Sequence, residues 1–383
     1  MRIISKIIAL VLVVFSYSCY APILNMISGS HIIGSNEPKK EQSKPNLPKP
    51  PPEVLNIIGV GDVMLGTNYP SARYLPIKKG KNLLPKNIIR ILREDADVTF
   101  GNLEGTILNK GRTIKNCKRC YAFRMPEYLA NILATAGFDV VSIANNHVRD
   151  FGKRGIKNTL KVLSKLKIEA AGLLTRPTAT FKKDGVKYGF TAFAPNIGTL
   201  NIRDIPKAKK IVQKLAQSND IVIVSFHGGA EGTTNQHVTK RTEYFYGENR
   251  GNVYKFAHAV IDAGADIVFG HGPHVTRAVE VYKKRFIIYS LGNFCTYGRF
   301  NLRGATGVAP IVNVKVKNGI NPEEKGEFIS AQITPIRQIK NKGVKIDRKK
   351  KAISLVRKLT KADGFLTNIK IDANGLIENV VVE

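Results

Sequence analysis

Short apolar runs that end in polar residues recur between residues 54 and 300, and helical patterns separate them. Runs such as "NIIGVGD", "DIVIVSFH" and "ADIVFGH" are almost continuously apolar, which is typical of strands buried on both faces of a sheet. Amphipathic segments such as "PKNIIRILREDA" lie between these runs. The alternation predicts an α/β domain, and it limits the fold more than any other feature of the chain.

Six of these strand ends carry side chains that can bind a metal ion, set among glycines or asparagines. In chain order the residues are Asp62, Asn102, Glu104, Asn145, Asn146, His147, Asp150, His227, Glu231, His271, His274 and Asn293. In open α/β sheets, ligands bind outside the carboxyl ends of the strands, so we expect these loops to converge. A tight turn or a helix cap would explain any one of these residues, but not all six strand ends together.

The side chains at these positions suggest which ligand they bind. Carboxylate, amide and imidazole groups without a thiolate suit Mn²⁺, Fe²⁺ or Zn²⁺. Six residues would be enough for two ions: Asp62, Glu104, Asn146, His227, His271 and His274. Two ions would hold an oxyanion and lower the pKa of a bridging water. His147 and Asp150 would then form a catalytic pair, in which the carboxylate orients the ring and the ring protonates a leaving group.

Residues 1–35 have the layout of an export signal or a membrane anchor. A basic start, "MRIISK", precedes the apolar "IIALVLVVF" and the small residues of "SYSCYA". A cleaved signal, a lipoprotein signal with lipidation at Cys19 and an uncleaved anchor are the alternatives. All three place the rest of the chain outside the cytoplasmic membrane. Residues 36–53 are polar and rich in proline, which predicts an extended tether.

The remaining chain is expected to form one domain. Residues 54–310 contain the α/β pattern, and residues 311–383 change to alternating strands and the basic amphipathic segment "RKKKAISLVRKLT". We expect these last residues to form edge strands and a surface helix that close the same domain.

The chain carries a large positive charge. Its 60 Lys and Arg residues against 29 Asp and Glu residues give a net charge of +31. Such an excess attracts polyanions, and the candidates are an acidic polymer, an anionic membrane or nucleic acid. The alternative is a lysine-rich solvated surface. The sequence has no recognition-helix, RNP or zinc-finger pattern, so we do not expect nucleic acid as a partner.

Cys117 and Cys120 form a single "CKRC" motif. A structural zinc site would need a second pair of ligands, whereas an exported chain favours a local disulfide. Unpaired thiols are the other alternative.

Several motifs, in this order, resemble those of the CapA family of capsule and poly-γ-glutamate synthesis proteins: "GVGDVMLG", "GNLEG", "YAFRMPEYLANILATAGFDVVSIANNHVRDFGKRGI", "VSFHGGAE", "GHGPH" and "YSLGNF". The resemblance covers residues 54–310. It implies a four-layer α/β/β/α sandwich, distantly like that of calcineurin-type metallophosphoesterases, with a two-metal centre. It also implies that the six residues named above are the metal ligands. Gly228 stands where a Trp is common in the family.

The resemblance further implies a membrane-anchored accessory protein for the synthesis or export of an acidic cell-surface polymer. Other polymer-synthesis subunits are then expected partners. Five more residues are expected to bind substrate or support the ligands: Asn102, Arg124, Asn145, Glu231 and Asn293. One alternative is a metallophosphoesterase that acts on an anionic small molecule or a lipid-linked phosphate. The other is a binding module that holds polymer or metal without turnover.

Overall fold

The computed structural model describes residues 50–116, 121–319, 321 and 324–380. The chain divides into two units, Met1–Pro48 and Lys49–Glu383, and every described residue belongs to the second unit. The predicted signal or anchor with Cys19, most of the predicted tether, and Cys117 and Cys120 lie outside the described residues. No helix in the described part of the chain has both the length and the apolar character needed to cross a membrane.

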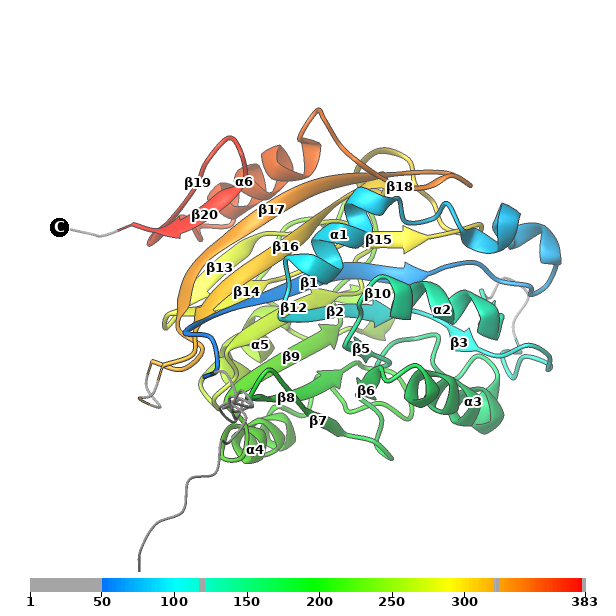
Figure 1. Ribbon diagram of the computed structural model, residues 1–383, viewed down its shortest axis with the longest axis horizontal. Helices are drawn as coiled ribbons and strands as arrows, with labels where there is room; N and C mark the ends of the chain where they lie inside the picture. Colours follow the sequence, from blue (N-terminus) through cyan, green and yellow to red (C-terminus); the bar gives the residue numbers. More distant parts are fainter. Residues whose placement is uncertain (1–49, 117–120, 320, 322–323, 381–383) are drawn as a thin grey trace, which may run out of the picture. The chain divides into compact units, whose positions relative to one another are not determined.

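The larger sheet runs in the order β19-β20-β17-β16-β1-β2-β5-β6, with β15 beside β1 and β18 beside β17 (Figure 1). Its parallel strands are β1 (Val54–Met64), β2 (Val98–Leu103), β5 (Val140–Ser142), β6 (Glu169–Ala171) and β15 (Asn293–Thr296). The antiparallel strands are β16 (Val308–Lys317), β17 (Phe328–Ile339), β18 (Gly343–Ile346), β19 (Ile369–Ile371) and β20 (Leu376–Asn379).

The smaller sheet runs in the order β13-β14-β12-β9-β8-β7. Its central strands are parallel: β8 (Val186–Phe193), β9 (Ile221–His227), β12 (Ile267–His271) and β14 (Arg285–Ile288). Its edges are antiparallel: β7 (Thr178–Lys183) and β13 (Val279–Tyr282). Two short pairs lie outside both sheets: β3 (Thr106–Ile107) with β4 (Arg124–Met125), and β10 (Tyr244–Phe245) with β11 (Glu248–Asn249).

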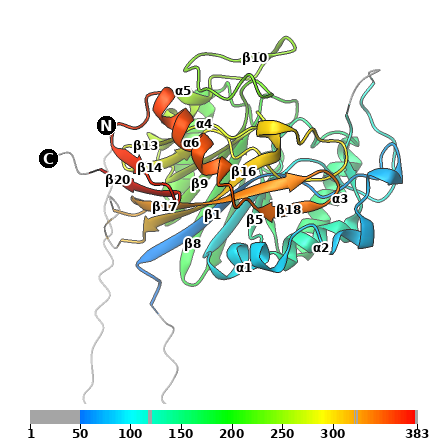
Figure 2. The same cartoon turned by 90° about the horizontal axis from the view of Figure 1, so that it is seen from above.

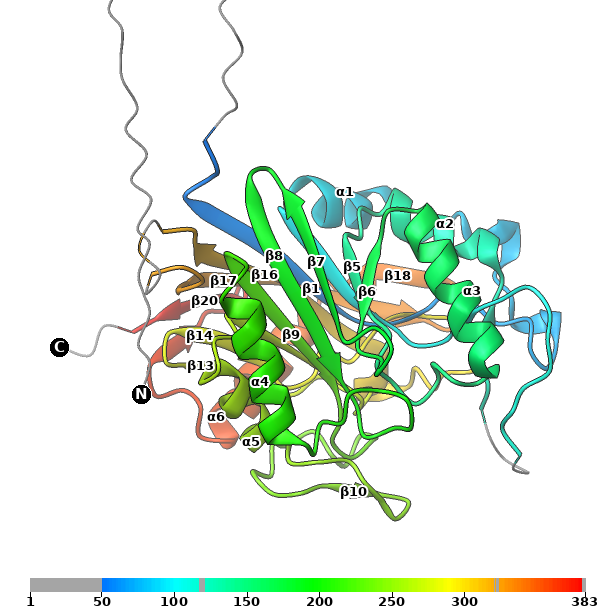
Figure 3. The same cartoon turned by 90° about the horizontal axis from the view of Figure 1, so that it is seen from below.

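Helices cover the outer face of each sheet. On the larger sheet lie α1 (Lys86–Glu94), α2 (Glu127–Thr135) and α3 (Gly152–Lys165). On the smaller sheet lie α4 (Ile205–Ala216) and α5 (Val253–Ile261), with α4 in front of β8 and β9 in Figure 3. The basic helix α6 (Lys351–Ala362) contacts β16, β17 and β13, and so joins strands of both sheets (Figure 2). Short 3₁₀ turns are η1 (Ala72–Tyr74), η2 (Ile77–Gly80) and η3 (Gly304–Gly307).

The two sheets pack face to face through large apolar side chains. Phe100 on β2 stacks on Phe269 of β12 with ring centroids 5.2 Å apart, and it lies 5.4 Å from the ring of Phe190 on β8. Alternate residues of β1 and β2 face the helices instead, which explains why both strands are apolar throughout. The predicted four-layer α/β/β/α fold, closed by C-terminal strands and a basic helix, is confirmed.

Helix α4 was not among the predicted elements. Asp204 caps it by accepting a hydrogen bond from the backbone N–H of Lys207 at 3.1 Å, and Pro206 lies in its first turn. This pair of start signals precedes the apolar face that packs on β8 and β9, and it is visible in the sequence "RDIPKAKKIV".

Candidate metal centre

Strand ends from both sheets meet at one buried position. In the larger sheet, Asp62 lies near the end of β1 and Glu104 follows β2. In the smaller sheet, His227 and His271 are the last residues of β9 and β12 and are register partners. All four side chains are fully buried, because they lie between the two sheets at the carboxyl ends of the strands.

Asp62 differs from the prediction in one respect, because it lies within β1 and not in a loop after the strand. The register of β1 with β2 shifts between Gly59 and Asp62, and the register with β15 shifts directly after Asp62. Such an irregularity redirects a side chain. Gly61 permits it, since a Cβ there would lie 2.0 Å from the carbonyl oxygen of Gly292.

The two histidines of "FGHGPHV" both face Asp62. His271 Nδ1 lies 3.2 Å from Asp62 Oδ1, and His274 Nδ1 lies 2.9 Å from Asp62 Oδ2. His274 has a φ of 57°, in the left-handed region, so the chain turns sharply after β12. Because of this turn, the two rings contact different oxygens of the same carboxylate.

Glu104 joins the second part of the cluster. Its Oε1 lies 3.4 Å from His227 Nε2 and 3.5 Å from His274 Nε2. Ligand atoms of Glu104, His227 and His274 lie within 4.8 Å of one another, which is close enough for one ion to contact all three. The structure therefore brings together Asp62, Glu104, His227, His271 and His274.

Several buried polar atoms of this cluster have no hydrogen-bond partner among the described residues. They are both carboxylate oxygens of Glu104, both ring nitrogens of His227, Nε2 of His271 and Oδ1 of Asn146. Buried polar atoms in folded proteins are nearly always paired, so this concentration at one place indicates a ligand. Carboxylate, imidazole and amide groups are those that borderline divalent ions accept. The residues present therefore fit a divalent metal ion.

The charges in the cluster depend strongly on one another. Burial alone would raise the pKa of Asp62, but the hydrogen bonds from His271 and His274 hold it well below its usual range. Burial disfavours the charged ring of His274, yet Glu104 and Asp62 outweigh this effect and raise its pKa to about 10. Burial lowers the pKa of His227 far below its usual value, and Arg250 adds to this effect. Burial also raises the pKa of Glu104 well above its usual value, so the cluster contains a neutral His227 ring beside a carboxyl group that holds its proton readily.

Amide side chains hold the carboxylate and the neighbouring loop in place. Asn102 donates a hydrogen bond to Asp62 Oδ1 at 2.8 Å, and Asn145 donates to Asn102 Oδ1 at 3.1 Å. Asn145 Oδ1 accepts from the backbone N–H of His147 at 3.0 Å. Asn293 donates to the carbonyl oxygen of His274 at 3.2 Å. Three predicted supporting residues therefore contact the cluster or its loops directly.

His147 and Asp150 form a close pair. His147 Nδ1 lies 2.8 Å from Asp150 Oδ2, and His147 Nε2 lies 4.0 Å from Glu104 Oε1, so the ring extends from the carboxylate toward the cluster. Lys115, which the sequence did not single out, places its ammonium group 2.5 Å from Asp150 Oδ1. Burial lowers the pKa of His147 more than Asp150 raises it.

Arg250 is another residue near the cluster that the sequence did not single out. Its buried guanidinium lies 3.1 Å from Glu231 Oε1 and 3.1 Å from Glu248 Oε2, and it donates to the carbonyl oxygen of Gly229 at 3.1 Å. Glu231 Oε2 in turn lies 3.9 Å from His274 Nε2. Arg250 thus holds Glu231 beside the cluster. Its sequence context, "YGENRGN", is typical of an exposed polar turn, so the burial of Arg250 could not be predicted from it.

Arg124 does not join the cluster. Its guanidinium donates to Asn68 Oδ1 at 2.6 Å and to the carbonyl oxygen of Gly111, and it lies over the rings of Tyr69 and Phe151. These contacts fix the loops around β3 and β4. Arg124 therefore contacts these loops and not the cluster, and its contact with substrate stays a prediction.

A cavity of about 660 Å³ opens over the cluster. Its polar lining comes from Asn146, His147, Glu231 and His274, among others. Aromatic and cationic side chains also line it: Tyr121, Phe123, Tyr246, Phe300, Lys115 and Arg299. The cluster is therefore reachable by a ligand that carries both apolar and anionic groups.

The sequence profile of the family described as "Bacterial capsule synthesis protein PGA_cap" matches residues 56–297. The chain belongs to this family. The PGA_cap match contains every residue of the cluster and of its supporting shell, from Asp62 to Asn293. It ends before β16, so the C-terminal strands and α6 lie outside it.

Relatives of the PGA_cap chain include two Bacillus proteins. "Capsule biosynthesis protein CapA" of Bacillus anthracis is 29% identical over 269 residues, covering 63% of this chain and 60% of the relative. "PGA biosynthesis protein CapA" of Bacillus subtilis (strain 168) is 28% identical over 260 residues, covering 63% of each protein. The chain therefore spans about three fifths of the length of these curated relatives.

Solved structures show a more distant similarity to this PGA_cap protein. A hypothetical protein from Thermus thermophilus is 14% identical with a TM-score of 0.43, covering 74% of this chain and 100% of that chain. Purple acid phosphatase from yellow lupin is 11% identical with a TM-score of 0.36, covering 78% of this chain and 55% of that chain.

The backbone of Arg250 explains why a glycine stands at position 228, where the resemblance leads one to expect a Trp. A Cβ on Gly228 would lie 2.8 Å from Ile202 Cδ1 and 3.0 Å from the carbonyl oxygen of Arg250. The buried Arg250 segment thus occupies the space next to Gly228 in this PGA_cap chain.

Proposed function

We propose that this chain is an accessory protein in the synthesis or export of an acidic cell-surface polymer of the capsule or poly-γ-glutamate type. We further propose that its domain holds two divalent metal ions that serve hydrolysis of a phosphoester or an amide. The names of the two Bacillus relatives support the first part. One observation carries the second part: Glu104, His227 and His274 place ligand atoms within 4.8 Å of one another.

Six side chains would hold the ions: Asp62, Glu104, Asn146, His227, His271 and His274. Their donor groups favour Mn²⁺, Fe²⁺ or Zn²⁺. Asp62, whose Oδ1 and Oδ2 face the rings of His271 and His274, would contribute its buried carboxylate to this site. When bound, such ions stabilise negative charge on a reacting oxygen and lower the pKa of a bound water.

His147 is the residue that we expect to move a proton. Asp150 holds the ring through Nδ1, which leaves Nε2 directed toward Glu104 at the edge of the cavity. A ring in this position can give a proton to a leaving group or take one from water. The ammonium group of Lys115 contacts Asp150 Oδ1 and helps to hold that carboxylate in place. Glu231, held by its ion pair with Arg250, would contact the substrate where it lines the cavity.

We also propose an outward-facing location at the cell membrane. Residues 1–35 would attach the chain, and residues 36–53 would let the domain reach polymer away from the membrane. The net charge of +31 suits an acidic polymer and an anionic membrane surface. Other polymer-synthesis subunits are the expected protein partners. Cleavage of the domain by protease added to intact cells tests the orientation, and full protection would contradict it.

The metal proposal is tested with the full chain and two histidine variants. His227→Ala removes a buried ligand, whereas His237→Ala removes an exposed ring that contacts Asp363. After incubation with Mn²⁺, Fe²⁺ or Zn²⁺ and desalting, metal content is measured by mass spectrometry. We expect stoichiometric metal in the parent chain and in His237→Ala, and loss in His227→Ala. Thermal unfolding of each variant checks that the fold is retained.

Hydrolysis of bis(p-nitrophenyl) phosphate and of poly-γ-glutamate by the same proteins separates the alternatives. Turnover by the parent chain that is lost in His227→Ala supports a metal-dependent hydrolase. Metal without turnover, together with salt-sensitive polymer binding, would favour a binding module. Phosphodiester turnover without any effect of the polymer would favour a small-molecule metallophosphoesterase. A parent chain that never retains stoichiometric metal would contradict the metal centre, and a deletion strain with unchanged surface polymer would contradict the accessory role.

A further inference from the structure

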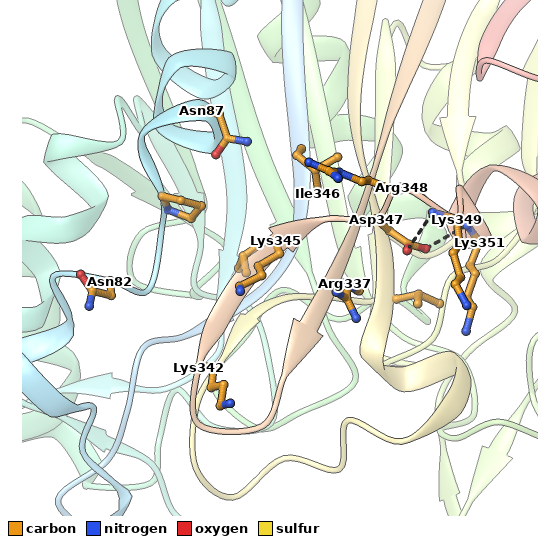
Figure 4. Close-up of a pocket in the computed structure, with 13 residues that line it drawn as sticks. Asn82, Asn87, Arg337, Lys342, Lys345, Ile346, Asp347, Arg348, Lys349 and Lys351 are labelled. Carbon is orange, nitrogen blue, oxygen red and sulfur yellow. Dashed lines mark hydrogen bonds between the residues drawn. The ribbon is translucent and has the colours of Figure 1, made fainter.

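A second cavity, of about 850 Å³, lies between the start of α1, the β17–β18 hairpin and the start of α6 (Figure 4). It is larger than the cavity at the metal centre and is formed by different residues. Its cationic lining residues are Arg337, Lys342, Lys345, Arg348, Lys349 and Lys351. We call this cavity the basic groove.

The basic groove has six cationic side chains and a single acidic one, Asp347. All six cationic side chains are exposed, and none of them takes part in the Lys and Arg ion pairs of the described residues. The groove also contains Asp347, which is buried. Its oxygens accept hydrogen bonds from the backbone N–H groups of Lys349 at 3.3 Å and Lys351 at 3.0 Å, where α6 starts. Asp347 therefore fixes the backbone at the start of α6, where Lys349 and Lys351 line the groove.

Two of the cations oppose each other across a strand pair. Arg337 on β17 is the register partner of Lys345 on β18, and both side chains are exposed. Figure 4 shows them on the hairpin with Lys342 at its turn. Like charges directly opposite each other destabilise a strand pair. A bound anion would relieve this repulsion, so the pair is consistent with an anion-binding surface.

The other lining residues restrict the kind of anion. Pro85, Val308 and Val344 add apolar surface, and none of the lining residues is aromatic. Proteins that bind single-stranded nucleic acid stack the bases on aromatic rings, which this groove lacks. A flat anionic membrane would contact exposed ridges better than a concave groove. A polymer of carboxylates joined through short methylene segments, such as polyglutamate, matches both the charge and the apolar lining.

Cationic side chains also line a third cavity, which shares residues with the cavity of the metal centre and lies beside segments that line the basic groove. An intermediate cavity of about 620 Å³ is lined by Arg299, Arg303 and Lys340, and it shares Tyr121, Arg299, Phe300 and Asn301 with the cavity of the metal centre. Lys340 and Lys342 belong to the same hairpin turn, and Arg303 and Val308 flank η3. The intermediate cavity and the basic groove therefore adjoin the same two segments.

We propose that the basic groove binds a linear polycarboxylate chain, and that the intermediate cavity guides this chain to the metal centre. The identity of the polymer rests on the proposed function, whereas the charge and shape of the groove do not depend on it. All six cationic residues lie beyond residue 297, where the family match ends. The cationic residues of the groove thus lie outside the region that the family model matches.

The test is the binding of fluorescently labelled poly-L-glutamate to the full chain, followed by anisotropy at several salt concentrations. The groove variant combines Lys342→Gln, Lys345→Gln and Lys349→Gln. The control variant combines Lys207→Gln, Lys210→Gln and Lys214→Gln, which removes the same charge from exposed positions of α4. We expect roughly tenfold weaker binding and a shallower salt dependence in the groove variant only. Equal affinities for the two variants would overturn the proposal.

Other polyanions provide the second arm of the test. Vesicles that contain phosphatidylglycerol and single-stranded oligothymidylate are titrated against the same variants. Selective loss of vesicle or DNA binding, with poly-L-glutamate binding retained, would overturn the proposal in favour of a membrane or nucleic-acid surface. His227→Ala is expected to lose metal, whereas the groove variant is expected to retain it, because its three lysines lie outside the cavity of the metal centre. A failure of the groove and a failure of the metal centre are therefore distinguished by different variants.

Discussion

His274 Nδ1 lies 2.9 Å from Asp62 Oδ2, although 212 positions separate the two residues in the sequence. One residue comes from the larger sheet and the other from the loop after a strand of the smaller sheet. The contact therefore exists only when the two sheets are packed face to face. Asp62 is fully buried, so its interaction with the ring of His274 is stronger than it would be in water. The geometry of the cluster therefore depends on the packed core that excludes water from it.

The first prediction concerns this carboxylate. Asp62→Asn keeps the shape of the side chain but removes the charge that faces His271 and His274. We expect metal affinity to fall by more than about 100-fold, since loss of even an outer partner of a metal ligand costs 10–100-fold. Metal titration by calorimetry measures this change. Asp204→Asn serves as the control, because Asn caps α4 as well as Asp does. Equal metal affinity in both variants would contradict a ligand role for Asp62.

The second prediction concerns His147 and Asp150. If Asp150 acts by orienting the ring, then Asp150→Asn and His147→Ala each lower kcat, and the double variant is no slower than His147→Ala alone. We expect a loss of roughly 10²–10⁴-fold in hydrolysis by the metal-loaded chain with little change in KM. Additive losses in the double variant would show that Asp150 acts independently of His147, for example through the backbone of Phe123.

Much of the fold was predictable, because buried parallel strands show up as apolar runs of limited length. The cluster was predictable for a related reason, since polar residues that directly follow such runs share one edge of the sheet. Asp62 was placed in a loop because the irregularity in β1 depends on contacts with β2 and β15, which local sequence does not encode. Arg250 was missed because its burial comes from the loop folding back on Gly229, and the position of Arg124 away from the cluster follows from partners in distant loops.

The third prediction compares two ion pairs with the same shortest N–O distance of 2.7 Å. Arg277 and Glu243 are buried and form two parallel contacts, whereas the side chains of Arg176 and Glu169 are 43% and 36% exposed. Arg277→Met leaves a buried carboxylate without its partner, and we expect it to lower the free energy of unfolding by about 3–5 kcal/mol. Arg176→Met should cost less than about 1 kcal/mol. Urea unfolding followed by circular dichroism measures both, and similar losses would contradict the role of burial.

The fourth prediction is a pH dependence of stability that comes from Asp266, which lies outside the metal centre. Burial raises the pKa of Asp266 to about 7, although Arg285 and the backbone N–H of Val222 favour the charged form. Between pH 4 and pH 7 the folded chain therefore holds a proton at this residue that the unfolded chain has released. The unfolded state binds fewer protons in this range, so the contribution of Asp266 to stability falls as the pH rises.

Asp266→Asn removes this titration and keeps a neutral side chain of the same shape. We expect the free energy of unfolding of the parent chain, minus that of the variant, to decrease by roughly 2–3 kcal/mol between pH 5 and pH 8. Urea unfolding at several pH values gives this difference, and all other titrating groups cancel because they are common to both proteins. The decrease should end near pH 7, where the folded carboxyl has lost its proton. A difference that stays constant over this range, or that increases with pH, would show that Asp266 is charged throughout and is stabilised by Arg285.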